Sequence, residues 1–168
     1  MAASPAPRAR ARSRAPAAAA EPPPVTVRAV RQADLPQVIA LDATVTGVEK
    51  QAYWRRVYRR YGVGGKDQRH FLVAVSGAQI VGFLIGEVRD WEFGSPPCGW
   101  VFAIDVDPAL RQAGVGTRLL QAVSELFRRA GVTKLRTLLA SDNVLILSFF
   151  RSQGMTAGSL IPLEMSLT

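Results

Sequence analysis

The sequence predicts an α+β domain built around a central, mostly antiparallel sheet. Short strand-like apolar runs alternate along the chain with segments in which apolar residues recur at the spacing of a helix face. Two of the strand-like runs, residues 70–75 and 79–88, are separated only by a turn around Ser76 and Gly77, which is typical of a hairpin. The chain has 168 residues, of which 48% are hydrophobic, so it can build one sizeable core.

Composition divides the chain near residue 24. Residues 1–24 are dominated by alanine, proline and arginine, and such a segment cannot bury enough apolar surface to offset the entropy lost on ordering. We therefore predict a disordered tail at residues 1–24 and one domain at residues 25–168. The tail lacks the apolar stretch of a secretory signal.

The first half of the domain is predicted to contain a strand, two helices and a hairpin. Alternating valines predict the strand at residues 25–30. Apolar residues at helical spacing predict helices at residues 34–44 and 49–61, and the hairpin follows.

The second half is predicted to alternate strands with helices. Glycines at 131 and 154 fit the ends of the two helices, because helices often stop at a left-handed residue. The elements are a strand at 100–106, a helix at 117–130, a strand at 134–139, a helix at 145–153 and closing strands at 155–156 and 163–167.

The loop between the strand at 100–106 and the next helix has the residues of an anion-binding site. The strand stops before Pro108, and Arg111, Gly114 and Gly116 precede the helix. Glycines let backbone N–H groups approach an anion, and the first helical turn offers unpaired N–H groups at a positive dipole end. Arg111 adds a charge that can bind phosphate through two hydrogen bonds. Alternatively, the glycines serve only close packing at a helix start.

Two other phosphate loops have a different pattern. A Walker loop needs a lysine after its last glycine, and none follows Gly114 or Gly116. A Rossmann loop needs three glycines after the first strand, whereas two lie here, late in the chain. The pattern Arg111-x-x-Gly114-x-Gly116 instead resembles the pyrophosphate loop of the GNAT family of acyl-CoA-dependent N-acetyltransferases.

A second segment extends this resemblance. GNAT proteins typically carry an asparagine after a strand, then an aromatic pair, then glycine and a large apolar residue. The matching residues here are Asn143, Phe149, Phe150, Gly154 and Met155. The start of the domain is also similar, so the resemblance covers roughly residues 25–168.

The resemblance implies a GNAT fold that uses acetyl-CoA as co-substrate. The sheet is then expected to splay at a parallel pair of strands and to be flanked by about four helices. The pantetheine arm is expected to pair with the backbone of Ile104 and Val106 like an added strand and to contact Asn143. The pyrophosphate is expected to lie against Arg111, Gln112, Ala113, Gly114, Val115, Gly116 and Thr117.

The residues leave the general acid without a tyrosine and offer two candidates for the general base. Many GNAT enzymes protonate the leaving thiolate with a tyrosine seven residues after the asparagine, but Phe150 holds that position and cannot donate a proton. Asp105 interrupts an apolar strand, so it is one candidate base; Glu87, near the end of the preceding strand, is the other. Alternatively, Asp105 is a carboxylate satisfied by arginines, and Glu87 is a solvent-facing strand end.

The expected function is transfer of an acetyl group from acetyl-CoA to a primary amine, with a protein lysine as the first choice of acceptor. A small amine, such as a polyamine, an aminoglycoside or a metabolite, is the alternative. A non-catalytic acyl-CoA sensor is a further option, because Phe150 replaces the usual acid. The aromatic residues of the second helix either belong to the core or line the acceptor cleft; these are Tyr53, Trp54 and Tyr58.

Other classes are disfavoured by composition. The net charge of +8 is not arranged as a basic stripe interleaved with aromatic residues, and no apolar run reaches a membrane span, so neither nucleic acid nor membrane is an expected partner. Cys98 and His70 lack partners at metal-ligand spacing, so no metal is expected, and His70 should lie at a partly exposed strand edge. A single cysteine cannot form an internal disulfide, which fits a cytoplasmic location. A homodimer is left open.

Overall fold

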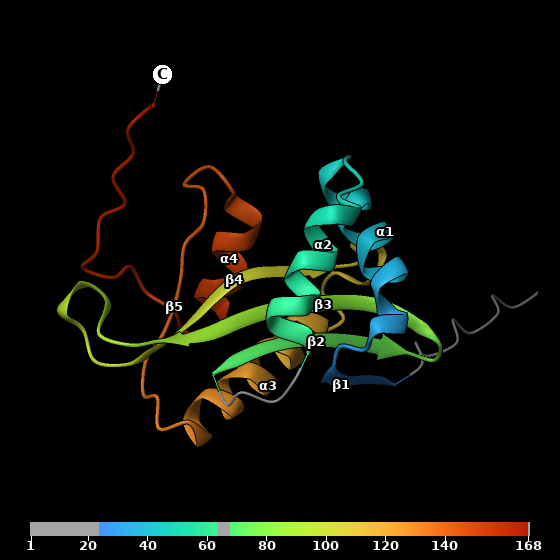
Figure 1. The fold of residues 1–168 in the computed structure, drawn as a ribbon, viewed down its shortest axis with the longest axis horizontal. Coiled ribbons are helices and arrows are strands. Elements are labelled where there is room, and N and C mark those ends of the chain that lie inside the picture. The colour runs from blue at the N-terminus through green and yellow to red at the C-terminus, as the bar shows by residue number, and fades with distance from the viewer. Residues whose placement is uncertain (1–23, 64–67, 168) are drawn as a thin grey trace, which may run out of the picture.

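A computed structural model describes residues 24–63 and 68–167, and within them it has one five-stranded sheet (Figure 1). The strands lie in chain order, and the first four are antiparallel to their neighbours, whereas the last pair is parallel. They are β1 Val25–Ala29, β2 Arg69–Ser76, β3 Gln79–Arg89, β4 Cys98–Val106 and β5 Leu135–Thr137. The predicted fold class is confirmed, while the tail predicted at residues 1–24 lies almost wholly outside the described residues.

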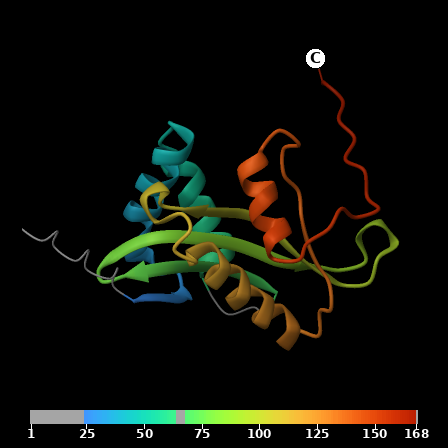
Figure 2. The same ribbon diagram turned by 180° about the vertical axis from the view of Figure 1, so that it is seen from behind.

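The helices cover both faces of the sheet (Figures 1 and 2). They are α1 Leu35–Thr46, α2 Gln51–Val57, α3 Val115–Arg129 and α4 Val144–Ser152. A π-helical turn, Tyr58–Gly62, extends α2, so the helix predicted at 49–61 is present with a wider last turn. Helix α3 begins two residues earlier than predicted, because Gly114 adopts a left-handed conformation and caps it.

Two apolar cores result, one on each face of the sheet. The core under α1 and α2 contains the fully buried Val38 and Phe83, with Trp54 2% exposed. The core under α3 contains Leu119 and Val123, also fully buried, and α4 packs against it. The two faces of the sheet therefore pack against different helices. Each side chain of β4 points either toward α1 and α2 or toward α3 and α4.

Strand β4 has an irregular register with β3. Ile85 pairs with Ala103 and Gly86 pairs with Val101, which leaves Phe102 as an extra residue on β4. Because of this β-bulge, Val101 and Ala103, which are two residues apart, lie on opposite faces of the sheet instead of the same face.

The predicted closing strands at 155–156 and 163–167 are wrong for the structure described here. Residues 155–167 form neither helix nor strand, and Figures 1 and 2 show them leaving the domain after α4. The alternation of apolar residues was a correct local signal, but a strand also needs a hydrogen-bonding neighbour, which the described residues do not provide here. Strand β5 is likewise shorter than the predicted 134–139.

Candidate active site

The parallel pair at the end of the sheet opens into a gap between two strands. Strand β5 pairs with β4 only from Gly99 to Val101, whereas β3 continues to pair with β4 as far as Val106. Within the described residues, the outer backbone edge of β4 from Phe102 to Val106 therefore has no strand beside it. An extended ligand can add to such an edge as a strand would.

The bulge determines which backbone groups face that open edge. Gly99 N–H donates toward β5, to Lys134 O at 2.9 Å, whereas Asp107 N–H donates toward β3, to Val81 O at 2.9 Å. Backbone groups alternate in direction along a strand, so Ile104 and Val106, which differ in phase from Asp107, direct their N–H and C=O groups toward the open edge. These are the two residues expected from the resemblance to pair with a pantetheine arm.

The loop after β4 is shaped for an anion. A carboxylate oxygen of Asp107 accepts a hydrogen bond from Ala109 N–H at 2.9 Å and fixes a 3-10 turn, Pro108–Leu110. Gln112 and Gly114 then adopt left-handed conformations, with φ of 74° and 76°. This geometry carries the chain directly into the N-terminus of α3.

The first turn of α3 leaves several backbone donors outside the helical hydrogen-bond ladder. The first helical bond of this region joins Arg118 N–H to Gly114 O at 3.0 Å, so the N–H groups of 115–117 precede the ladder. Arg111 is exposed beside them. Ala113 N–H is committed to Leu110 O at 3.2 Å, so it is the weakest donor candidate of the predicted set.

The two loop glycines serve different purposes. Gly114 needs its left-handed backbone, and a Cβ added there would meet nothing within 4 Å. A Cβ on Gly116 would instead lie 3.0 Å from the ring of Phe149, so this glycine lets α4 pack closely against α3. Close packing therefore accounts for a glycine at position 116, whereas the left-handed backbone accounts for the one at position 114.

The asparagine segment forms the start of α4, which packs against α3 through Phe149. Asn143 is the N-cap of α4, and its side-chain oxygen accepts a hydrogen bond from Ile146 N–H at 3.2 Å, which leaves its amide N–H₂ to donate elsewhere. Phe150 is 3% exposed and belongs to the core under α3. The position of the usual acid is therefore an apolar packing position in this chain.

Asp105 lies on the sheet face that α1 and α2 cover. It pairs with Phe83 in the β3–β4 register, and residues paired in this way share a face. Burial is the largest cause that raises the pKa of Asp105 to about 6; the Asp42 carboxylate raises it further, while Lys50 and Arg111 oppose the rise. A carboxylate with such a pKa can take up a proton near neutral pH.

Glu87, the other candidate base, is committed to neighbours. It is 8% exposed, accepts a hydrogen bond from the Tyr61 hydroxyl at 3.2 Å, and pairs with the Arg89 guanidinium at 3.0 Å and Arg69 at 3.7 Å. The prediction of a solvent-facing strand end is therefore wrong. Glu87 pairs with Trp100 in the register, which places it roughly 15 Å along the strand from Asp105.

Two further residues escaped sequence reasoning. Asp42 on α1 is 3% exposed and accepts hydrogen bonds from Trp54 Nε1 at 2.8 Å and Lys50 Nζ at 3.0 Å. Tyr61 packs its ring on Phe102, the bulge residue, with centroids 5.1 Å apart. The only sequence signal for Asp42 was an acid within an otherwise apolar helix face.

The aromatic residues of α2 divide between core and surface. Trp54 is a core residue and packs edge-on against Phe83 with ring centroids 4.9 Å apart. Tyr58 is partly buried against the same core, whereas Tyr53 is 38% exposed. Of the three, only Tyr53 presents much of its surface to solvent.

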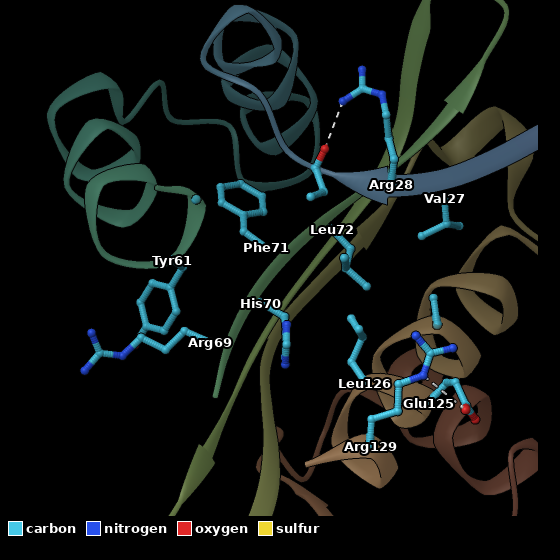
Figure 3. A pocket seen from close by; sticks show the side chains of 13 residues that line it. Val27, Arg28, Tyr61, Arg69, His70, Phe71, Leu72, Glu125, Leu126 and Arg129 are labelled. Atoms are coloured by element: carbon cyan, nitrogen blue, oxygen red, sulfur yellow. Dashed lines mark hydrogen bonds and ion pairs between the residues drawn. The ribbon is translucent and has the colours of Figure 1, made fainter. Parts of the chain in front are cut away.

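A separate pocket lies where β1 ends and leaves the start of β2 open (Figure 3). It measures about 500 Å³ between β1, β2, α3 and the turn after α2. Its Arg28 pairs with Asp34 at 2.6 Å and its Arg129 with Glu125 at 3.5 Å. His70 lines it as a half-buried residue, as predicted, and this pocket is remote from the open edge of β4.

Metal binding, membrane insertion and thiolate chemistry were also considered for residues 24–63 and 68–167. No group of three or more His, Cys, Asp or Glu in them could hold a metal ion, and none of their helices is long and apolar enough to cross a membrane. Burial raises the pKa of the Cys98 thiol, whose sulfur lies 3.2 Å from Lys134 O. Cys98 is therefore a packing residue rather than a reactive thiolate.

Comparison with known proteins agrees with this geometry. The model of the acetyltransferase (GNAT) family matches residues 35–155. An L-2,4-diaminobutyric acid acetyltransferase from Nocardia farcinica is 32% identical over 88 residues, which are 52% of this chain and 44% of that protein, so the match spans less than half of the relative's length.

Solved structures show the same fold at low identity. The aminoglycoside N-acetyltransferase AAC(6')-Iy in complex with CoA superposes with a TM-score of 0.76 at 16% identity, covering 89% of this chain and 99% of that one. The aminoglycoside 6'-N-acetyltransferase AAC(6')-Ih from Acinetobacter baumannii gives 0.72 at 17% identity, covering 86% and 100%. Both likenesses establish architecture alone.

Proposed function

The chain belongs to the GNAT family of acetyltransferases, and from this premise we propose that it transfers an acetyl group from acetyl-CoA to the primary amine of a small cationic molecule. One observation carries the proposal: the open edge of β4 leads directly into the anion-binding loop, while Asp105 lies on the same strand and faces the other helices. A donor site and a proton acceptor thus share one strand.

The donor site supports acetyl-CoA through three sets of groups. Backbone groups of Ile104 and Val106 offer hydrogen bonds to an extended amide-containing arm. The N-terminus of α3 and Arg111 offer donors and positive charge to a pyrophosphate. The Asn143 amide N–H₂ offers a further donor beside the gap. When bound, acetyl-CoA supplies the acetyl group as a thioester.

Asp105 is the proposed general base, which accepts a proton from the ammonium group of the acceptor. An alkylammonium group has a pKa near 10 and must lose a proton before it can attack. Asp105 is ionised above pH 6, so near neutral pH it can both attract the cation and accept its proton, directly or through a water molecule. Glu87 is the weaker candidate because two arginines and Tyr61 already engage its carboxylate.

The leaving thiolate needs no acid at the Phe150 position. A thiol with a pKa of about 8.5 is a tolerable leaving group, and positioning together with backbone donors can supply most of the acceleration. An acid contributes about 10²–10⁴-fold where one is present. The loss of tyrosine therefore argues for a slower enzyme rather than for an inactive protein.

The acceptor is proposed to be small and cationic. The curated relative is named for diaminobutyric acid, and the two solved neighbours described above are named for aminoglycosides, which are small polyamines. The acidic groups Asp42 and Asp105 also act on one another through space on this side of the sheet. The names of the relatives favour the small amine over the protein lysine that the sequence alone put first, whereas the two acidic groups suit either cation.

A defined acceptor panel tests this function. The purified chain would be incubated with acetyl-CoA and separately with diaminobutyrate, a polyamine, an aminoglycoside and lysine-containing peptides, and release of free CoA would be followed. Turnover confined to small amines would support the proposal, and turnover confined to peptides would replace its acceptor. Acetyl-CoA binding without turnover on any amine would instead favour an acyl-CoA sensor.

A further inference from the structure

A lysine covers the acidic group that acts on the proposed base. The Asp42 carboxylate accepts hydrogen bonds from Trp54 Nε1 at 2.8 Å and from Lys50 Nζ at 3.0 Å. Only 4% of the Asp42 side chain is exposed, whereas 35% of the Lys50 side chain is. A molecule that approaches from solvent therefore meets the Lys50 ammonium group before it can meet the Asp42 carboxylate.

One chain of contacts connects Lys50 with Asp105. Trp54, which donates to Asp42, packs edge-on against Phe83 with ring centroids 4.9 Å apart, and Phe83 pairs with Asp105 across β3 and β4. Helix α1, which carries Asp42, and helix α2, which Lys50 precedes, lie side by side over this face of the sheet (Figure 1). The charge of Lys50 also lowers the pKa of Asp105, so the two groups act on one another through space.

The Lys50 ammonium group can donate further hydrogen bonds. It carries three N–H donors, of which the structure directs one to Asp42. Nζ also lies 5.7 Å from the centre of the half-exposed Tyr53 ring, whose face attracts a cation. A carboxylate that binds Lys50 from solvent would form a charge-assisted hydrogen bond, and the cation would lie between it and Asp42.

We propose that Lys50 determines acceptor specificity by binding the carboxylate of a diamino acid whose side-chain ammonium group is directed to Asp105. The inference rests on the proposed acetyl transfer and names the class of its acceptor. A second ammonium group at this place would be repelled by Lys50, so a plain diamine should be the poorer acceptor. A lysine within a protein chain lacks the free carboxylate and should also be poor.

Lys50 takes no part in the bonds that change. Asp105 accepts one proton of the ammonium group, and the nitrogen then forms a C–N bond to the acetyl carbon while the C–S bond of the thioester breaks. The second proton lost by the nitrogen protonates the departing thiolate, directly or through water, and Asp105 returns its proton to solvent. Lys50 stays protonated throughout, so its effect is on acceptor binding and orientation.

Matched pairs of acceptors test this role, because the diamine of each pair is the diamino acid without its carboxylate. The pairs are diaminobutyrate with diaminopropane, ornithine with diaminobutane, and lysine with diaminopentane. With the full chain and acetyl-CoA, the diamino acid of the pair whose length fits the site should have a kcat/KM about 10–100-fold higher, as expected for a hydrogen bond between charged groups. A diamine that equals or exceeds its partner in all three pairs would overturn the proposal.

Three variants locate the preference at Lys50. Lys50→Met should give similar kcat/KM values within the pair, whereas Lys50→Arg keeps a charged donor and should retain most of the preference. Arg56→Met is the matched control, since it removes an exposed cation from the same helix and should leave the preference unchanged. Because both acceptors are compared on one protein, any loss of folded enzyme cancels. A preference that survives in Lys50→Met, or that Arg56→Met removes equally, would overturn the proposal.

Calorimetry separates failure of this inference from failure of the proposed function. Turnover of an aminoglycoside but of no diamino acid would overturn the role of Lys50 and leave acetyl transfer intact. If no amine is acetylated, acetyl transfer is overturned, and binding of the same pairs to the protein with CoA bound tests Lys50 by itself. Tighter binding of the diamino acid that disappears in Lys50→Met would support the diamino-acid site, and equal affinities within every pair would overturn it.

Discussion

Asp105 and Phe83 lie opposite one another across the β3–β4 pair, which places an ionisable carboxylate next to a fully buried aromatic ring. The same relationship fixes the direction of the Asp105 side chain toward α1 and α2 and away from α3. Burial on this face is the largest cause of the raised pKa of Asp105. This cross-strand pair thus places the proposed proton acceptor on the α1 and α2 face of the sheet, where Arg111 of the loop after β4 still acts on it electrostatically.

Asp105→Asn should lower kcat by about 10²–10⁴-fold, because the amide cannot accept the amine proton. The affinity for acetyl-CoA, measured by calorimetry, should stay within a few-fold, since the Asp105 side chain faces α1 and α2, whereas the proposed donor groups are backbone groups of β4 and of the N-terminus of α3. In the unaltered protein, kcat/KM should fall as the pH drops below 6, where Asp105 becomes protonated.

That acid limb should disappear in Asp105→Asn and persist in the control Glu87→Gln. An unchanged limb in Asp105→Asn, or its loss only in Glu87→Gln, would transfer the role of base to Glu87.

Asp42→Asn should move the acid limb of kcat/KM to lower pH. The Asp42 carboxylate raises the pKa of Asp105, so replacing it with a neutral amide lowers that pKa. The asparagine oxygen can still accept the hydrogen bond from Trp54 Nε1, which limits structural damage. A pH–rate profile for both proteins measures the shift, and a limb that stays in place or rises would show that Asp42 does not act on the proton acceptor.

The strand, loop and helix of the proposed donor site could be predicted because their signals are local. A glycine at position 114 predicts a left-handed backbone conformation just before the helix, and in the structure Gly114 has a φ of 76°. Gln112 adopts the same conformation without being glycine, so nothing in its identity revealed it. The bulge at Phe102 was equally hidden, because neither glycine nor proline marks it.

Features that depend on distant partners were beyond local patterns. Asp42 meets Lys50 and Trp54 from the start and the middle of α2, and Glu87 meets Tyr61 from the helical turn after α2. The alternation at 163–167 predicted a strand, yet only the presence of a hydrogen-bonding neighbour decides whether such a segment pairs. Local periodicity therefore predicted most helices and strands, whereas the burial of polar side chains depended on packing between segments that are distant in the sequence.

Gly114→Ala should weaken acetyl-CoA binding while the fold survives. A left-handed alanine costs about 1–2 kcal/mol, and relief of this strain shifts the loop amides. Gly47→Ala is the matched control: Gly47 caps α1 with φ of 72° and also has nothing within 4 Å of an added Cβ. Both variants should lose similar stability in denaturant, and only Gly114→Ala should lose affinity in calorimetry. Equal affinity in the two variants would exclude the loop from the donor site.

Asp34→Asn should destabilise the fold at neutral pH by about 2 kcal/mol, and the difference should vanish in acid. Asp34 accepts two hydrogen bonds from Arg28, at 2.6 and 2.8 Å, and one from Arg31 N–H at 2.7 Å. The Arg28 hydrogen bond is the largest cause that lowers the pKa of Asp34 in the folded protein. A carboxylate with a depressed folded pKa stabilises the fold above its unfolded pKa of about 3.9 and loses that contribution as the pH falls through the folded value. Urea unfolding at pH 7 should therefore separate the two proteins by the strength of charge-assisted hydrogen bonds, and unfolding at the lowest pH at which both fold should bring them together. A gap that stays constant with pH would mean that Asp34 acts through its shape and packing, and that its charge contributes nothing.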